Sequence, residues 1–510
     1  MLLTDDVCYL AVASRDARFD GRFFTGVTTT GIYCRPVCPS RTPRREHTRF
    51  FRCAAEAESA GFRPCLRCRP ETAPGSPAWT GTRATVSQAL RLLSAGYLDE
   101  HRVDELAGRL GMGDRHLRRL FLRHLGVTPV QVAQTRRIHF ARSLLADSGL
   151  AISDVAFASG FGSLRRFNAL FRKLYQQSPT ALREKLTAST PKAESPLELR
   201  LRFRPPYAWQ AMLRFLAPRA TPGVEAVSGG VYRRSVVVDG AQGLIEVTLA
   251  DSGDCLLLRL FSSGSRGLIH VVDRARRLFD LSADPAEINA VLGRDEPMAA
   301  LVRAEPGLRV PGAWDGFELA VRAILGQQVS VAAATGSAGL LAERYGEPLA
   351  EPARGLTRLF PSAARLAEAD PADLRLPRTR ANAVVHLARA VASGELRFEP
   401  YGDLDQAVAR LTALPGVGEW TAQYVAMRAL GEPDAFPASD LGLLRAAGRW
   451  MRLATPASLE AKAEEWRPWR SYAAMHLWHS LGSRAQARAA SARAASQPSR
   501  RAGRLVGSRG

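Results

Sequence analysis

The sequence has no long hydrophobic run. None of the apolar stretches in its 510 residues reaches the roughly 20 residues that a membrane-spanning helix needs. The opening stretch, MLLTDDVCYLAV, carries acidic residues where a secretory signal would carry Lys or Arg. These two absences predict a cytoplasmic protein that neither crosses nor anchors to a membrane.

Cysteine is also scarce, with seven residues in the whole chain. Because the cytoplasm keeps thiols reduced, so few cysteines argue against a disulfide framework and favour metal binding or chemistry. Acidic residues are outnumbered as well: 49 Asp and Glu face 70 Lys and Arg, which gives a net charge of +21. An excess of this size indicates nucleic acid or an anionic membrane surface as the partner.

Four of the cysteines form two close pairs, Cys34 with Cys38 in GIYCRPVCPS and Cys65 with Cys68 in FRPCLRCRPE. Two such pairs separated by 26 residues are typical of a site in which four thiolates hold one Zn²⁺ ion. The spacing predicts the metal. It does not distinguish a purely structural zinc from one whose thiolates react.

The residues around these pairs add a more specific indication. The stretch DGRFFTGVTTTGIYCRPVCPSRTPRREHTRFF, followed by AAEAESAGFRPCLRCRPE, resembles the amino-terminal domain of the Ada family of bacterial adaptive-response regulators. The resemblance implies that Cys34 accepts a methyl group from a methylphosphotriester in DNA, with Cys38, Cys65 and Cys68 as further zinc ligands. It also implies DNA-backbone contacts for Thr30 and Arg41.

Methyl transfer to such a site would change its charge. A zinc ion with four thiolates has a formal charge of minus two, and methylation of one sulfur leaves minus one, so repulsion from the DNA backbone falls. Repair of a phosphate would thereby raise DNA affinity. We expect opposing positive charge from the neighbouring arginines, Arg35, Arg41, Arg44 and Arg45.

The next segment is a repeat. VDELAGRLGMGDRHLRRLFLRHLGVTP and ISDVAFASGFGSLRRFNALFRKLYQQSP share one pattern of short helix, Gly-containing turn and basic amphipathic helix. This pattern predicts a tandem helix-turn-helix, whose second helices fit the major groove. A helical bundle with basic faces is the alternative. The span resembles the AraC-type regulator domain, which implies RNA polymerase as a partner, and we expect DNA contacts from Arg118, Arg119, Arg165 and Arg166.

The third segment changes pattern twice. Residues 197–261 alternate as antiparallel strands should, and from VDRARRLFDL onward the pattern is helical almost to residue 482. Within the helical part, LPGVGEWTA predicts a helix-hairpin-helix. Its glycines, Gly416 and Gly418, would let backbone amides face a DNA phosphate without a Cβ in the way. This hairpin predicts DNA binding but not catalysis.

Asp440, in DAFPASDLGLL, is the candidate catalytic residue. A carboxylate near the deoxyribose would stabilise the oxocarbenium-like sugar of glycosidic cleavage or position water. The alternative is an ordinary aspartate that caps the next helix. Residues 197–482 resemble the AlkA family of 3-methyladenine DNA glycosylases through several motifs in order, among them VRAILGQQVSVAAAT, LPGVGEWTAQYVAMRAL and WRPWRSYAAMHLWH.

The second resemblance implies an aromatic pocket for a flipped base, made by Trp420, Tyr424 and Trp478. Electron-poor alkylated purines stack well on such rings. Trp420 stands where strand-cutting relatives carry a Schiff-base Lys, so the reaction should stop at an abasic site. One residue departs from the family pattern: Gln328 occupies the position of the Leu that fills the gap left by the extruded base, which leaves lesion preference open.

A Pro-Cys-His-Arg run, which would mark the alkylguanine transferase domain that usually ends Ada proteins, does not occur. We therefore predict a multidomain, mainly α protein with α+β parts that joins three functions: a zinc-dependent sensor of phosphate methylation, a promoter-binding regulator and a monofunctional glycosylase for alkylated bases. It should act on double-stranded DNA as a monomer associated with the bacterial nucleoid. The predicted divisions are a zinc domain (1–74), a tandem helix-turn-helix (85–186), an antiparallel β subdomain (197–282), a helix-hairpin-helix domain (283–482) and a disordered basic tail (483–510), with linkers at 70–85 and 187–196.

Two alternatives stay open at this point. In one, the chain is a regulator whose glycosylase half only grips DNA. In the other, the zinc is purely structural and the chain is a glycosylase with a constitutive DNA-binding arm.

Overall fold

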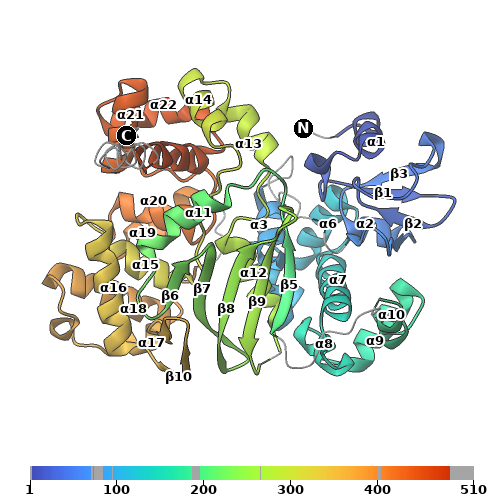
Figure 1. The fold of residues 1–510 in the computed structure, drawn as a ribbon, viewed down its shortest axis with the longest axis horizontal. Helices are drawn as coiled ribbons and strands as arrows, with labels where there is room; N and C mark the ends of the chain where they lie inside the picture. Colours follow the sequence, from blue (N-terminus) through green and yellow to red (C-terminus); the bar gives the residue numbers. More distant parts are fainter. Residues whose placement is uncertain are drawn as a thin grey trace, which may run out of the picture.

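A five-stranded sheet lies at the centre of the computed structural model, between a helical region on one side and the N-terminal parts of the chain on the other (Figure 1). The structure describes residues 3–70, 73, 84–94, 96–186, 196–264, 266–398 and 404–482. Most of the two predicted linkers and the whole of the predicted tail, 483–510, lie outside the described residues. Of the helices in the described ranges, none combines the length and apolar character that crossing a bilayer would require.

The cysteine-rich part, residues 3–70, is a small α+β unit. Its sheet has the order β3-β1-β2-β4, in which β1 pairs antiparallel with β2 and β3 while β2 pairs parallel with β4. Tyr33 and Phe62 lie in its core. The elements are α1 (Asp5–Ser14), β1 (Phe24–Val27), β2 (Ile32–Cys34), β3 (Thr48–Phe51), α2 (Ala54–Ser59) and β4 (Arg63–Pro64).

The helices of residues 84–186 confirm the predicted repeat. The matched pair Phe121 and Phe171 is fully buried, and each copy turns at a glycine with positive φ, +71° at Gly111 and +80° at Gly160. A 19-residue helix, α7, joins the two copies. The helices are α3 (Ala84–Ser94), α4 (Tyr97–Glu100), α5 (Val103–Arg109), α6 (Asp114–Leu125), α7 (Pro129–Asp147), α8 (Ile152–Ala158), α9 (Leu164–Tyr175) and α10 (Pro179–Leu186).

The central sheet is antiparallel throughout, in the order β5-β9-β8-β7-β6. One stretch expected to alternate as strand is instead a helix, α11, because Trp209, Met212 and Leu216 are spaced to share one buried face. The elements of this region are β5 (Leu197–Arg202), α11 (Trp209–Leu216), β6 (Glu225–Ser228), β7 (Val231–Val238), β8 (Ala241–Leu249) and β9 (Cys255–Ser262).

The remaining chain is helical as predicted, except for the small hairpin β10 (Pro348–Ala353) and β11 (Leu356–Arg358). A final helix runs from residue 470 to residue 482. The other helices are α12 (Leu268–Leu278), α13 (Pro285–Leu292), α14 (Glu296–Ala304), α15 (Gly316–Leu325), α16 (Val331–Tyr345), α17 (Ala363–Ala367), α18 (Arg378–Ala392), α19 (Leu404–Thr412), α20 (Glu419–Arg428), α21 (Leu441–Met451) and α22 (Pro456–Ala463).

Candidate functional site

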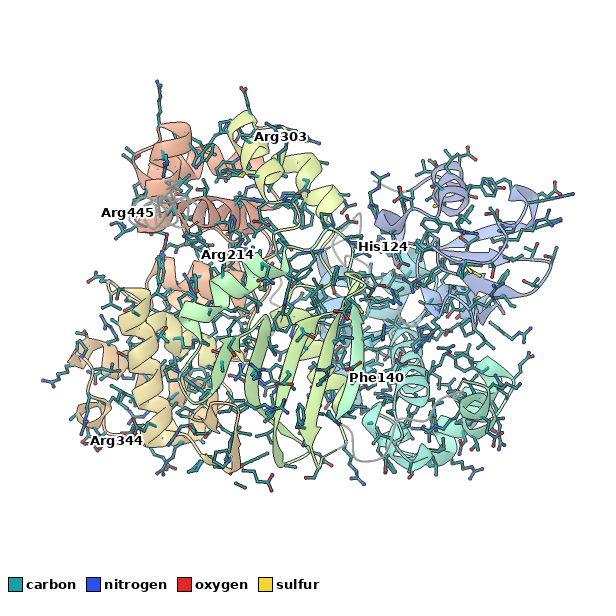
Figure 2. The ribbon with its side chains drawn as sticks, in the orientation of Figure 1. His124, Phe140, Arg214, Arg303, Arg344 and Arg445 are labelled. Carbon is teal, nitrogen blue, oxygen red and sulfur yellow. The ribbon has the colours of Figure 1, made fainter. Side chains whose placement is uncertain are left out.

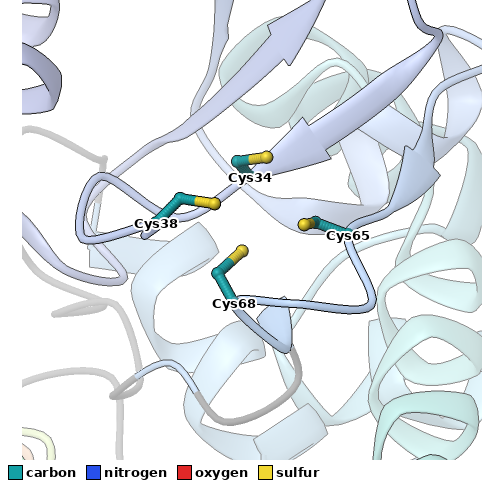
Figure 3. Close-up of side chains that lie close together, drawn as sticks. All are labelled: Cys34, Cys38, Cys65 and Cys68. Carbon is teal, nitrogen blue, oxygen red and sulfur yellow. The ribbon is translucent and has the colours of Figure 1, made fainter. Parts of the chain in front are cut away.

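The four paired cysteines come together although 26 residues of chain separate the pairs (Figure 3). The sulfurs of Cys34, Cys38, Cys65 and Cys68 all lie within 4.8 Å of one another. Backbone bonds hold the two turns: the Cys65 amide donates to the Tyr33 carbonyl at 3.0 Å, and the Cys38 amide donates to the Arg35 carbonyl at 3.1 Å. The predicted pairing of turns is therefore observed.

The donor set suits a single zinc ion. Sulfurs this close compete for the same protons. Contacts with the other three thiols, that of Cys38 first, together with burial raise the pKa of Cys34 far above its usual value, while contact with Cys34 first of all holds the pKa of Cys38 far below its usual value. A divalent cation at their centre would allow all four to stand as thiolates. Four cysteine sulfurs are a ligand set that zinc takes in proteins, so the residues present fit one zinc ion.

The four thiols differ in access to solvent. Cys38, Cys65 and Cys68 are 9%, 6% and 7% exposed, whereas Cys34 at the end of β2 is half-buried. The amide of Arg35 donates to the Cys68 sulfur at 3.4 Å. Taken as a whole residue, Cys34 is therefore the most exposed of the four cysteines.

The arginines near the quartet are not equivalent. Arg35, expected in the basic surface, is 6% exposed; its guanidinium pairs with Asp20 and donates to the Cys68 carbonyl at 3.1 Å. Arg35 thus supports the metal site from inside the protein. Arg41 and Thr30 are exposed, Thr30 in the turn between β1 and β2, so both stand where DNA could reach them.

Helices α6 and α9 present the basic residues that the sequence singled out. Arg118 and Arg119 are exposed on α6, and Arg165 and Arg166 are exposed on α9. Arg118 forms an exposed ion pair with Asp114 at 3.4 Å, and such a pair is weak enough to exchange for a phosphate.

The hairpin between α19 and α20 approaches the turn that carries Gln328. The side-chain amide of Gln327 donates to the Gly416 carbonyl at 2.9 Å and to the Thr421 hydroxyl at 3.0 Å. Gln328 itself is exposed, with a positive φ of +54°. Residues other than glycine rarely adopt this backbone conformation, so contacts with the surrounding residues must hold the turn in place. Val329 and Val331 beside it are also exposed, at 40% and 39%.

Substitution of the two hairpin glycines should have different consequences. Gly416 has a φ of +84°, and a Cβ there would lie 2.5 Å from the Cβ of Ala383, whereas a Cβ at Gly418 meets no atom within 4 Å. We expect Gly416→Ala to lower the free energy of unfolding by about 1–3 kcal/mol, and Gly418→Ala, at the N-cap of α20, to lower it by less than about 1 kcal/mol. Urea titration of both variants measures the difference; equal losses would contradict the close packing at Gly416.

Asp440 lies at the N-terminus of α21, where it does cap the helix: its Oδ1 accepts the Leu443 amide at 2.9 Å. Its carboxylate is also held by two indoles. The Trp478 Nε1 donates to Oδ1 at 2.8 Å, and the Trp420 Nε1 donates to Oδ2 at 3.0 Å. A cap needs only one of these oxygens, so the capping role does not account for the contacts to the two tryptophans.

The predicted aromatic residues form one cluster around this carboxylate. Trp420 and Tyr424 stack, with ring centroids 5.4 Å apart and planes 11° apart, and Trp478 meets Tyr424 edge to face at 6.3 Å. Burial raises the pKa of Tyr424, but the positive charges of Arg428 and Arg219 lower it by more, so the pKa lies below its usual value. Arg428 donates to the Tyr424 oxygen at 2.7 Å and to the Pro311 carbonyl at 2.7 Å.

Arg428 and Arg219 were not found in the sequence, and neither were three further residues of this site. Phe215 on α11 lies 6.5 Å from Trp478, ring to ring. Gly442 leaves room for the carboxylate: a Cβ there would stand 2.9 Å from Asp440 Oδ1 and 3.1 Å from Trp478 Cδ1. Gln327 links the turn to the hairpin. Only Gly442 had a visible signal, because a glycine in the first turn of a helix is unfavourable unless something requires it.

Four family models match consecutive parts of the chain. They are the metal binding domain of Ada at residues 7–71, a helix-turn-helix domain at 106–185, the AlkA N-terminal domain at 198–315, and the HhH-GPD superfamily base excision DNA repair protein at 321–471.

Relatives of known name match long stretches. The "Probable bifunctional transcriptional activator/DNA repair enzyme AlkA" of Mycobacterium tuberculosis is 43% identical over 478 residues, covering 93% of this chain and 96% of that protein. "DNA-3-methyladenine glycosylase 2" of Escherichia coli is 40% identical over 285 residues, 55% of this chain and 97% of that protein. The Escherichia coli "Bifunctional transcriptional activator/DNA repair enzyme Ada" is 38% identical over 159 residues, 31% of this chain and 43% of that protein.

Proposed function

Because this chain belongs to the family of bifunctional transcriptional activator/DNA repair enzymes named AlkA, we propose that it excises alkylated bases from DNA and senses methylated DNA phosphates with its cysteine quartet. The observation that carries the first activity is the convergence of two indole N–H groups on the Asp440 carboxylate. We propose that each of the domains predicted from the sequence carries one of these functions.

The excision reaction follows from the charge at Asp440. In N-glycosidic hydrolysis the bond from C1′ to the base breaks, its electron pair leaves with the base, and positive charge develops on the sugar. The Asp440 carboxylate stabilises that charge. Water then adds to C1′ and loses a proton, which leaves an abasic site. A cationic alkylated base departs as a neutral molecule, so no general acid is required.

The hydrogen bonds select one oxygen for this task. Oδ1 accepts two hydrogen bonds, from the Leu443 amide and the Trp478 indole, whereas Oδ2 accepts one, from the Trp420 indole. A carboxylate oxygen has two lone pairs. Oδ2 therefore keeps acceptor capacity for the sugar or the incoming water, while the clamp fixes its direction.

The aromatic cluster would hold the base. Trp420, Tyr424 and Trp478 offer faces and edges on which an electron-poor or cationic purine stacks more strongly than a normal base. The exposed turn at Gln328, tied to the hairpin through Gln327, would occupy the space that the extruded base leaves in the duplex. The hairpin amides at Gly416 and Gly418 would bind the backbone nearby.

Base release tests this activity directly. The full chain is incubated with duplex DNA treated with a methylating agent, and free bases and strand breaks are measured separately. We expect release of 3-methyladenine with strands that stay intact until alkali is added. No release would leave a protein whose C-terminal part only grips DNA, and direct strand cleavage would contradict the absence of a lysine at position 420.

The room left by Gly442 gives a sharper test. We expect Gly442→Ala to lower the rate of base release by about tenfold, since displacement of the carboxylate or of Trp478 by a few tenths of an ångström misplaces the charge. Gly448→Ala, in the same helix, is the control: its Cβ would meet only the Leu453 carbonyl at 3.4 Å. Both changes favour the helix equally, so equal activity in the two variants would refute the crowding argument.

We propose Cys34 as the methyl acceptor of the zinc-thiolate site. As a residue it is the most exposed of the four, and zinc, when bound, keeps its sulfur a thiolate at neutral pH. The sulfur attacks the methyl carbon of a methylphosphotriester, the carbon–oxygen bond breaks, and its electron pair stays on the phosphate as a diester anion. Arg41 and Thr30 would hold the flanking phosphates.

The methylated protein would act as a transcriptional activator through α6 and α9. We propose promoter DNA as the partner of Arg118, Arg119, Arg165 and Arg166, and RNA polymerase as the partner of the bound regulator. A monomer on the bacterial nucleoid is the form in which the chain would act, because both the predicted tandem reading helices and the excision site belong to one chain.

A further inference from the structure

Helix α7 of the regulator lies along β5, the edge strand of the central sheet (Figure 1). Ile138, Ala141 and Leu145 on α7 belong to the same buried cluster as Leu199 and Leu201 on β5. Phe140, labelled in Figure 2, packs against that cluster as a half-buried side chain. The two halves therefore share one apolar core, and an edge strand that would otherwise be open is covered.

Charged residues surround the shared core, and three of the ion pairs between the halves have the same polarity. Arginines of the N-terminal half, residues 3–186, meet carboxylates of the C-terminal half, residues 196–482. Arg91 on α3 pairs with Glu432 at 2.9 Å. The pairs of Arg136 on α7 with Asp273 on α12, and of Arg22 with Glu287 on α13, are also formed.

These ion pairs are partly removed from water. The side chains of Arg91 and Glu432 are 22% and 10% exposed, and those of Arg22 and Glu287 are 15% and 20% exposed. At such burial opposite charges are screened less by salt than on an open surface. Three pairs from separate elements also fix the relative orientation of the halves, which one pair could not.

A glycine of the N-terminal half also lies against a side chain of the C-terminal half. Gly96 has a φ of +86°, and a Cβ there would lie 2.4 Å from the His270 ring on α12. The His270 ring also lies 3.7 Å from the Asp99 carboxylate. A side chain at position 96 would displace the His270 ring, and the positive φ would be strained for it as well, so this contact between the halves uses a glycine.

We propose that the N-terminal half stays docked on the C-terminal half in solution, through the surface formed by α3, α7 and Arg22 on one side and β5, α12, α13 and Glu432 on the other. The partner that this surface fits is the excision half of the same chain. The regulator and the glycosylase then form one body, not two modules joined by a tether.

Other residues of α7 contact the turn that holds the second pair of cysteines. Arg142 is fully buried and donates to the Leu66 carbonyl, between the two ligands of the second cysteine pair, at 3.4 Å. Asp147 pairs with Arg69 at 3.1 Å, directly after Cys68. A single helix thus contacts both the turn of the metal site and the sheet of the excision half. DNA held by the regulator would be presented to Asp440 at a fixed place.

Charge reversal in the full chain tests the docking. The broken variant carries Arg22→Glu and Arg91→Glu. The swapped variant adds Glu287→Arg and Glu432→Arg, which restores those two pairs with reversed sign, and Asp284→Asn, because Arg22 also pairs with the Asp284 carboxylate at 3.5 Å. Small-angle scattering measures the radius of gyration. We expect it to increase by roughly 4 Å in the broken variant, because the radius of a compact chain depends on how closely its parts pack, and to return to the parent value in the swapped variant.

The control variant carries Arg18→Glu and Arg102→Glu. Both arginines are exposed, at 66% and 82% of their side chains, and each pairs with a neighbouring aspartate of its own segment. The net charge changes as in the broken variant, so its radius should equal that of the parent. Circular dichroism checks that every variant is folded. An unchanged radius in the broken variant overturns the proposal, and so does a swapped variant that remains expanded.

Discussion

Replacing Asp440 with asparagine is expected to lower the rate of base release from alkylated duplex DNA by about 10³-fold, or about 4 kcal/mol of transition-state stabilisation. The amide keeps the shape of the side chain but removes the negative charge that opposes the developing sugar cation. It also places an NH₂ group against one of two indole N–H donors, so one of the contacts from Trp420 or Trp478 is lost.

Asparagine separates the two roles of this residue. Asn and Asp are equally good at the N-terminus of a helix, so the cap of α21 and the free energy of unfolding should change little. Asp315→Asn is the matched control: Asp315 caps α15 through the Glu318 amide at 2.9 Å and is exposed. We expect near-parental release from that variant. Release by Asp440→Asn within a factor of about five of the parent would reduce Asp440 to a helix cap.

Local sequence patterns predicted the framework of both sites. The spacing of four cysteines was enough to place their sulfurs together, because each pair occupies one tight turn. The repeat with Phe121 and Phe171 predicted two helix-turn-helix units, since each unit is specified by residues within one short stretch. The hairpin at Gly416 followed from the glycines that its turn requires.

Contacts between distant residues could not be predicted in this way. The partners Arg35 and Asp20, or Trp478 and Asp440, are far apart in the chain, and neither member carries a local mark of the other. The sequence predicted a strand where α11 lies, because the flanking segments alternate between apolar and polar residues. The helix itself is only eight residues long, too short for its helical periodicity to be clear. The position of Phe215 in the aromatic cluster depends on that helix.

The net charge of +21 predicts less about the DNA-binding surface than its size suggests. It was interpreted as a surface for DNA, and exposed arginines on α6 and α9 agree with that. Others are buried and structural: Arg142 and Arg204 are fully buried, and Arg428 is 4% exposed. Arg22, Arg91 and Arg136 face carboxylates of the other half. Composition counts charges, but only the fold separates those that meet solvent from those that hold the protein together.

Replacing Cys34 with serine is expected to abolish methyl uptake and at the same time to raise the affinity for unmethylated DNA. A serine hydroxyl stays neutral and is a poor nucleophile, so no methyl group is transferred. With three thiolates and a neutral fourth ligand, the zinc site has a formal charge of minus one, the value that methylation of the parent would produce. Each phosphate about 4 Å away then gains about 1 kcal/mol in water, which corresponds to roughly fivefold tighter binding.

Cys38→Ser distinguishes the nucleophile from the charge. It removes one thiolate from the same site and changes the formal charge equally, but it leaves Cys34 in place. We expect the same gain in DNA affinity, with methyl uptake retained on Cys34. Mass spectrometry after exposure to DNA with methylphosphotriesters locates the methyl group. Fluorescence anisotropy measures binding at low salt and at about 1 M salt, where screening should remove the gain.

Methyl uptake by Cys34→Ser would exclude Cys34 as the acceptor. An affinity that does not change in either variant would mean that the site's charge does not control binding, and the zinc would then be structural.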